Sequence, residues 1–405
     1  MPPRFQLVAR TGHPTFLDLP WELPLEEWQT PRLVNLIRGI SRHVVRFVDY
    51  DGRLYALKEL PERPARHEYT VLRRLQRQGL PVVEAVGLVT GRERDLDAVL
   101  VTRHLEYSLP YRALFAGHAV PDLRTHLLNA FAELLTRLHL GGFFWGDCSL
   151  SNALFRRDAG ALSAYLVDAE TGELHPELSD GQREYDVDIA RTNVVGELLD
   201  VEAEVGLPDD VDPDEIGDEV VARYDALWGE LTREETFGPD ERYRVTERLE
   251  RLNGLGFDVE ELQLEAAADG YRMRLDPRVV EPGHHRHRLL RLAGLDAQEN
   301  QARRMLNDIA RFRDAVERRE GRDVTESVAA SRWRDEVFEP TVAAVPEALW
   351  GRLPAAEVFH QVLEHRWFLS EAAGKDVGID EAARSYVESE LPGKPSERIV
   401  LEEGP

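Results

Sequence analysis

The chain has 405 residues, of which 42% are hydrophobic, so it is long and apolar enough for two or three folded domains. Its 75 acidic residues outnumber its 50 lysines and arginines, and the formal charge of -25 argues against nucleic acid or an anionic membrane as the main partner. The one cysteine, Cys148, excludes a disulfide framework. No run of about 18 apolar residues predicts a membrane span, and the N-terminus shows no signal-peptide core, so we expect a cytoplasmic protein.

The first part of the chain predicts a lobe built mainly of strands. Residues 1–30 hold five prolines and are expected to form a lead-in segment that lies on this lobe. Hydrophobic alternation predicts strands at 34–37, 43–50, 53–60, 82–89 and 97–104. Asp51-Gly52 between the second and third strands is a strong hairpin signal. Pro64 favours the start of a helix after the third strand, and Gly79 favours its end.

The middle of the chain is expected to be helical. Apolar residues at helical spacing predict helices at 122–139, 185–199 and 215–235. Gly141-Gly142 favours the end of the first of these helices. A hairpin is expected between the first and second helices, with its turn at 158–160.

Beyond Gly238-Pro239 the pattern changes to a mostly helical α+β region. It predicts a hairpin over 261–277 and helices at 241–255, 287–295, 298–320 and 381–386. The expected divisions are a lead-in at 1–30, a small lobe at 31–104, a large lobe at 105–236, a C-terminal domain at 237–375 and a tail at 376–405.

Ala56 and Lys58 alternate onto one face of the strand expected at 53–60. A small residue beside a lysine leaves room for a flat base and offers a charge to a phosphate. Glu68, in the first turns of the following helix, is placed to pair with Lys58 and to keep that side chain extended. The alternative is an ordinary strand lysine whose ammonium group reaches water.

The stretch WGDCSLSN, between an apolar helix and a strand, holds Asp147 and Asn152 with four residues between them. A carboxylate accepts a proton from a hydroxyl nucleophile, and an amide oxygen is a ligand for a hard metal ion. One tight loop can present both groups to the same point. The alternative is a polar turn that both side chains cap.

Asp168 ends an apolar strand one hairpin after Asn152. A carboxylate at a strand end suits Mg²⁺, although an aspartate that merely starts a turn would fit the same pattern. The chain thus carries, in order, a strand lysine, a helix glutamate, a loop with aspartate and asparagine, and a strand-end aspartate.

This order resembles the protein-kinase-like superfamily, whose catalytic loop has the D-x4-N spacing and whose metal-binding aspartate follows one hairpin later. The resemblance covers residues 30–235 and implies a bilobal kinase-like α+β fold, followed here by the mostly helical α+β domain. It implies that Lys58 holds the α- and β-phosphates of ATP and that Glu68 orients it. It further implies that Asp147 is the catalytic base and that Asn152 and Asp168 bind Mg²⁺. An aspartate at the place of Asp186 or Asp188 would brace the catalytic loop, although two acidic residues at a helix start, favoured by the helix dipole, also explain them.

The sequence also departs from the superfamily pattern. The segment between the first two strands, IRGISRH, has one glycine, Gly39, and we expect its backbone to approach a phosphate with help from Ser41, Arg38 or Arg42. Trp145-Gly146 stands before the catalytic aspartate, and Ala169-Glu170 follows the metal aspartate. These departures resemble the compact bacterial branches, which include lipopolysaccharide-core, aminoglycoside and RIO-type kinases.

The expected function is therefore Mg²⁺-ATP-dependent phosphorylation of a hydroxyl on a small molecule or protein that the sequence does not specify. The poor glycine loop favours an alternative, a pseudokinase that senses nucleotide or serves as a scaffold for a partner protein. Nucleotidyl transfer from a flipped ATP is a third hypothesis consistent with the same residues.

Overall fold

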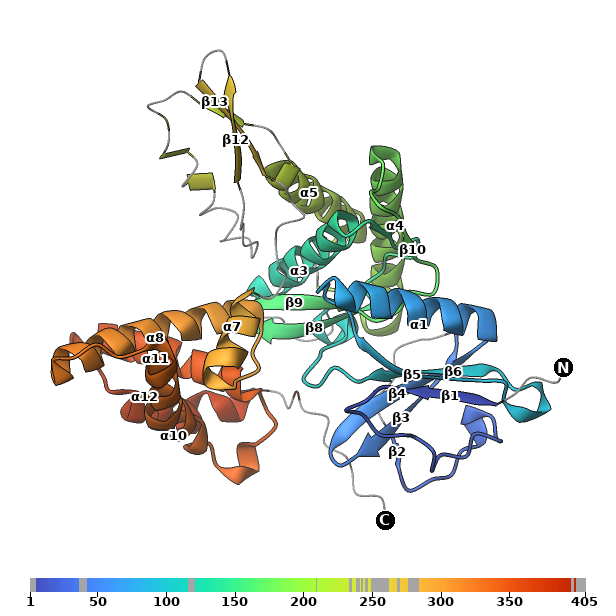
Figure 1. Cartoon of the computed structure of the whole chain (residues 1–405), viewed down its shortest axis with the longest axis horizontal. Helices are drawn as coiled ribbons and strands as arrows, with labels where there is room; N and C mark the ends of the chain where they lie inside the picture. The colour runs from blue at the N-terminus through green and yellow to red at the C-terminus, as the bar shows by residue number, and fades with distance from the viewer. Residues whose placement is uncertain are drawn as a thin grey trace.

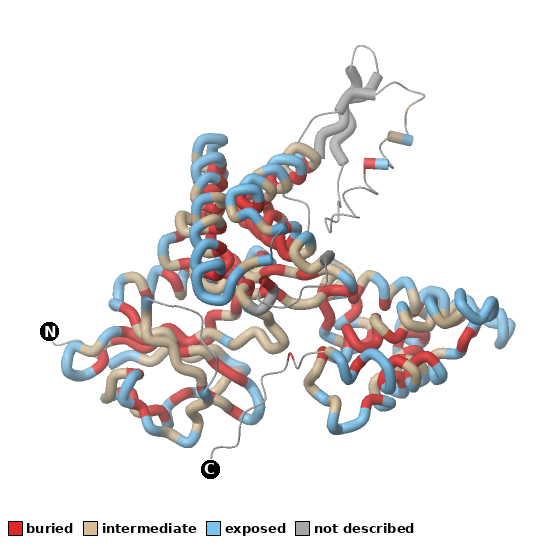
Figure 2. Tube along the Cα trace, turned by 180° about the vertical axis from the view of Figure 1, so that it is seen from behind, coloured by how far each residue is buried: buried red, intermediate tan, exposed pale blue. Residues whose placement is uncertain are grey.

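The computed structural model describes residues 5–35, 42–115, 121–208, 210–232, 284–394 and 397, together with short stretches within 235–275. Figure 1 shows three parts: a sheet with one covering helix, a helical middle, and a group of helices near the C-terminus. Buried positions run along the strands and on the inward sides of the helices (Figure 2). Within this part of the chain, no helix is long and apolar enough to cross a membrane.

The small lobe is an antiparallel sheet with the strand order β1-β5-β6-β4-β3-β2. Its elements are β1 (Gln6–Ala9), β2 (Leu33–Val34), β3 (Val44–Tyr50), β4 (Arg53–Leu60), α1 (Glu62–Arg77), β5 (Glu84–Thr90) and β6 (Ala98–Arg103). The turn between β3 and β4 places Asp51 at a φ of 55° and Gly52 at a φ of 78°. Two left-handed residues are what the Asp-Gly hairpin signal predicts.

The lead-in differs from a segment that only lies on the lobe, because its residues Gln6–Ala9 form β1 and pair with β5 at the sheet edge. Four residues are too short to show a clear alternation, so the sequence pattern missed this strand. Of the first expected strand, at 34–37, the structure shows Leu33–Val34 as β2, and residues 36 and 37 lie outside the described residues.

The rest of the lead-in covers the outer face of the sheet. Its apolar side chains pack on the side chains of β4 and β6 that point away from α1. The lead-in residues in this cluster are Phe16, Leu19, Trp21, Leu25 and Trp28. The opposite face packs against α1, so Lys58 and Ala56 lie on the inner side of the lobe.

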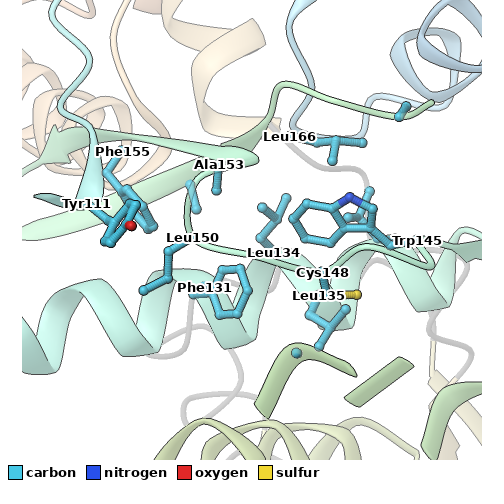
Figure 3. Close-up of a cluster of buried hydrophobic side chains, with 14 of the residues drawn as sticks. Tyr111, Phe131, Leu134, Leu135, Trp145, Cys148, Leu150, Ala153, Phe155 and Leu166 are labelled. Atoms are coloured by element: carbon cyan, nitrogen blue, oxygen red, sulfur yellow. The ribbon is translucent and has the colours of Figure 1, made fainter. Parts of the chain in front are cut away.

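The large lobe is built on α3, with strands and helices packed around it. Its elements are α2 (Tyr111–Phe115), α3 (Pro121–Leu140), β7 (Phe143–Phe144), β8 (Ala153–Asp158), β9 (Ala161–Leu166), β10 (Glu173–Leu174), α4 (Asp180–Val205) and α5 (Pro213–Thr232). Phe131 and Leu135 of α3 pack with Trp145, Cys148 and Leu150 (Figure 3). The apolar residues of the loop 145–152 are thereby anchored on α3.

The C-terminal part holds a three-stranded sheet, β11 (Glu235–Phe237), β12 (Leu262–Ala267) and β13 (Gly270–Leu275), followed by helices. The helices are α7 (His284–Ala293), α8 (Glu299–Glu320), α9 (Glu326–Trp333), α10 (Glu339–Ala343), α11 (Ala355–Ala373) and α12 (Ile379–Ser389). Trp333, Phe338 and Phe359 form the aromatic centre of their core. The helix expected at 241–255 falls mostly outside the described residues.

The range expected as a tail, 376–405, contains α12, which packs against α11. Tyr386 and Leu391 are buried in that contact, so the folded C-terminal region extends at least to Leu391. The amphipathic pattern of EAARSY predicted the helix but not its packing.

Candidate active site

Strand β4 places Lys58 against the first turns of α1. Lys58 Nζ lies 3.0 Å from Glu68 Oε2, and the Glu68 side chain is 1% exposed. The ion pair expected between strand and helix is therefore present. It joins the sheet of the small lobe to α1 and fixes the position of the Lys58 ammonium group.

The loop after β9 brings two further carboxylates to the same lysine. Lys58 Nζ lies 2.7 Å from Asp168 Oδ2 and 3.4 Å from Glu170 Oε2. Glu170 also lies 2.8 Å from His43 Nε2. One carboxylate oxygen from each of Glu68, Asp168 and Glu170 falls within 4.8 Å of the others. Sequence reasoning missed Glu170, although its place two residues after a strand-end aspartate was a signal.

The charges of this cluster shift the pKa values of its members. Burial lowers the pKa of Lys58, but the charges of Glu68 and Asp168 outweigh burial and raise it above its usual value. Burial raises the pKa of Glu68 to about 7, with Asp168 adding to the rise and Lys58 opposing it. Lys58 is therefore charged at neutral pH and faces the carboxyl groups of Glu68, Asp168 and Glu170. Several carboxyl oxygens gathered at one point are the kind of ligands that a hard cation takes.

Asp147 and Asn152 lie at the two ends of a tight loop. The Asn152 side chain Nδ2 donates to the Asp147 backbone oxygen at 3.1 Å and to its Oδ2 at 3.3 Å. Asn152 precedes β8 and Asp168 follows β9, and the Val167 amide donates to the Asn152 carbonyl oxygen at 3.0 Å. The base of one hairpin thus brings Asn152 and Asp168 to neighbouring strands, as the sequence predicted.

One face of α4 holds this loop in place. Asp186, which is fully buried, accepts hydrogen bonds from the backbone amides of Trp145 at 2.7 Å and Gly146 at 2.8 Å. Of the two aspartates considered for the bracing role, Asp186 therefore holds the loop, whereas Asp188 is exposed. His139 Nε2 lies 3.0 Å from the same carboxylate.

Two more residues of α4, Asn193 and Glu197, also hold the loop in place. Asn193 Nδ2 donates to Asp147 Oδ1 at 3.3 Å and to the Cys148 carbonyl oxygen at 3.0 Å. Glu197 accepts from the amides of Leu150 at 2.8 Å and Ser151 at 2.9 Å. Sequence reasoning missed both. The signal was their spacing of seven and eleven residues from Asp186, which puts all three on one helix face.

The inner face of the small lobe provides a surface beside Lys58. In the strand register Ala56 lies between Phe47 of β3 and Thr102 of β6. Phe47 in turn contacts the ring of His104 edge to face. Arg38, Gly39 and Ser41, expected at the phosphates, lie outside the described residues. Arg42, just after them, reaches to 3.9 Å from Asp147 Oδ2.

A cavity of about 540 Å³ lies elsewhere, where the small lobe, the β8–β9 hairpin and the C-terminal helices meet. It is lined by residues that include Arg103, His104, Arg156, Asp158, Tyr165 and Gln298. None of the predicted site residues lines this cavity, so it is separate from the cluster around Lys58.

The comparison with known families agrees with this geometry. Residues 51–191 match the lipopolysaccharide kinase (Kdo/WaaP) family. The match includes Lys58, Glu68 and the whole segment from Asp147 to Asp168, with the β8–β9 hairpin. The fold of this region is kinase-like, as the resemblance implied. Residues 226–391 match a domain of unknown function, DUF4032, so this match begins within α5 and covers the C-terminal part described above as far as Leu391.

No curated protein matches the chain. Among solved structures, a chain described as "WaaP in complex with acyl carrier protein" is 17% identical, with a TM-score of 0.38. The match covers 62% of this chain and 99% of that one.

Proposed function

We propose that the protein is a Mg²⁺-ATP-dependent phosphotransferase that acts on a hydroxyl group. The observation that carries this proposal is the convergence of Lys58, Glu68 and Asp168, next to the braced loop that holds Asp147 and Asn152. The match of 51–191 to lipopolysaccharide kinases supports the reaction class.

In this proposal Lys58 binds the α- and β-phosphates, and Glu68 keeps it oriented toward them. Asp168 and Asn152 hold Mg²⁺, with Glu170 close enough to share the site. These residues offer carboxylate and amide oxygens, which are the ligands that Mg²⁺ prefers, so the donor set fits the ion. The ion, when bound, neutralises charge on the phosphate oxygens.

Asp147 is the proposed base. The γ-phosphoryl group moves from ATP to the acceptor oxygen, the bond to the β-phosphate oxygen breaks, and ADP leaves. Asp147 takes the hydroxyl proton late in this transfer. Its two oxygens are oriented by Asn193 and Asn152, which donate to Oδ1 and Oδ2 respectively.

Replacing this base tests the proposal. Asp147→Asn should leave the fold and ATP affinity nearly unchanged, because the carboxylate acts in the transition state. Turnover should fall about 100- to 10,000-fold, the usual range for a lost general base. ATP hydrolysis or self-phosphorylation gives the rate, and isothermal titration gives the affinity. Asp188→Asn, an exposed position on α4, is the matched control.

The outcomes separate the hypotheses. If the variant keeps the full wild-type rate, Asp147 is not the base. A wild-type protein that binds ATP but neither hydrolyses nor transfers phosphate supports a pseudokinase. Products that gain the mass of AMP rather than of a phosphoryl group support nucleotidyl transfer.

A further inference from the structure

The hairpin β8–β9 carries one proposed metal ligand at each end of its base. Asn152 directly precedes β8 and Asp168 follows β9 after one residue. The two strands form a sheet of their own, and a two-stranded hairpin is only marginally stable by itself. Its register therefore depends on what packs against it, and any slip would move Asn152 away from Asp168.

The base of the hairpin is tied to the small lobe, where the Val83 amide donates to the Leu166 carbonyl oxygen at 2.9 Å. Its tip is held by the C-terminal domain. Asp158 ends β8 there, and it is 1% exposed. It accepts hydrogen bonds from the backbone amides of Gln301 at 2.8 Å and Asn300 at 3.2 Å, both in the first turn of α8.

Two side chains complete the shell of Asp158, namely Asn300 Nδ2 at 3.1 Å and Ser163 Oγ at 2.9 Å. A carboxylate at a helix N-terminus is further stabilised by the unpaired amides and the helix dipole. Burial nevertheless raises the pKa of Asp158 to about 6, and these hydrogen bonds oppose the rise. The contact is thus specific for an acceptor with two oxygens.

A second layer fastens the same tip to α11. Glu357 is 2% exposed and accepts from the Ala159 amide at 3.2 Å and from Gln301 Nε2 at 2.8 Å. Gln301 Nε2 also donates to the Arg157 carbonyl oxygen at 3.1 Å. Every residue of the tip from Arg157 to Ala159 is therefore bonded to the C-terminal domain.

We propose that Asp158 is a positioning residue through which the C-terminal domain sets the register of the β8–β9 hairpin and so the geometry of Asn152 and Asp168. The role rests on the proposed function, because it concerns the Mg²⁺ site of that reaction. It assigns to the region that matches DUF4032 the task of clamping the catalytic hairpin in cis. Figure 1 shows the hairpin between the sheet and the helices α7 to α12, where such a clamp must act.

The test compares Asp158→Ala and Asp158→Asn with wild type in the full chain. Asp314→Ala, an exposed aspartate in the middle of α8, is the control. The first readout is hydrogen exchange of the Val167 amide, which bonds Asn152 across the hairpin base. The second is the Mg²⁺ concentration that gives half-maximal enhancement of ATP binding.

In Asp158→Ala we expect faster exchange at Val167 and a requirement for Mg²⁺ that rises about tenfold or more, as for other groups that orient metal ligands. ATP binding without Mg²⁺ should not change. A general loss of structure would weaken that binding as well. Asp158→Asn keeps one acceptor oxygen and should lie between Ala and wild type. If Asp158→Ala does not fold, the Val167 exchange and the Mg²⁺ requirement of Asp158→Asn test the positioning role.

Normal exchange and a normal Mg²⁺ requirement in the folded variants would overturn the positioning role. If wild type shows no Mg²⁺-dependent ATP binding, the proposed function fails, while the exchange of Val167 still decides whether Asp158 sets the hairpin register.

Discussion

Lys58 is one of three lysines in a chain whose other cations are arginines. An ammonium group is a compact point charge that can move between partners, whereas a guanidinium binds one planar acid in a fixed geometry. Here the ammonium group contacts Glu68, Asp168 and Glu170. In the proposed function, a phosphate that binds Lys58 competes with Asp168 for the ammonium group. A metal ion bound to Asp168 would lower the free-energy cost of separating this ion pair.

His104 gives a test at the scale of one residue. Its Nε2 is buried and has no hydrogen-bond partner among the described residues. Burial lowers the pKa of His104 to about 4, against about 6.5 in an unfolded chain. The unfolded state therefore binds the proton first, and stability falls as the pH drops from about 6.5 toward 4.

Replacing His104 with phenylalanine removes this titration and keeps a ring against Phe47. Relative to His104→Phe, wild type should lose about 2 kcal/mol of unfolding free energy between pH 7.5 and about pH 5. Denaturant unfolding of both proteins at the two pH values measures it, and other titrating groups cancel in the difference. A difference between the proteins that does not change with pH would show that His104 does not titrate in this way.

At the scale of an element, one face of α4 holds the loop of Asp147 and Asn152 in its conformation through hydrogen bonds. Asp186, Asn193 and Glu197 lie on one face and bond six backbone or side-chain groups between Trp145 and Ser151. Asp186 is supported by His139, whose pKa is lowered by burial although Asp186 opposes this. A neutral His139 donates from Nε2 to Asp186 and accepts from the Tyr224 hydroxyl at Nδ1, 2.7 Å away.

Glu197→Gln tests whether these hydrogen bonds from α4 stabilise the loop. Glutamine offers one acceptor oxygen to two backbone amides, so a buried amide loses its charged partner at a cost of about 1–3 kcal/mol. We expect that loss of stability, a slower turnover, and unchanged ATP binding without Mg²⁺. Chemical denaturation and the rate of ATP hydrolysis measure them, with Glu202→Gln, exposed on the same helix, as the control. Wild-type stability and rate in Glu197→Gln would contradict the role of this face.

Most elements followed from local pattern. The Asp51-Gly52 hairpin, the helix of Glu68 and the long helix before the catalytic loop all lie where alternation, helical spacing and turn residues placed them. The order of motifs also placed Lys58 beside Glu68 and Asn152 near Asp168. The sequence pattern did not predict β1, because this strand is only four residues long and is stabilised by its pairing with β5.

At the scale of the whole molecule, the contacts that sequence could not predict join distant segments. Asp158 has an ordinary turn-like surrounding in the sequence, yet three of its four hydrogen bonds come from residues more than 140 positions later, in α8. Glu170, Asn193 and Glu197 are polar residues whose role depends on which face meets the loop. The lead-in likewise covers the outer side of the sheet with Trp21 and Trp28, which no local pattern connects to it.

Our central proposal is that the kinase-like part binds ATP through a metal ion held at Asp168. Isothermal titration of ATP with and without Mg²⁺, on wild type, Asp168→Ala and the exposed control Asp188→Ala, tests it most directly. The account predicts Mg²⁺-enhanced binding in wild type and the control. In Asp168→Ala it predicts that the enhancement is lost, while ATP alone still binds because Lys58 is freed of one acidic partner. Equal Mg²⁺ enhancement in Asp168→Ala, or no ATP binding by wild type, would contradict it.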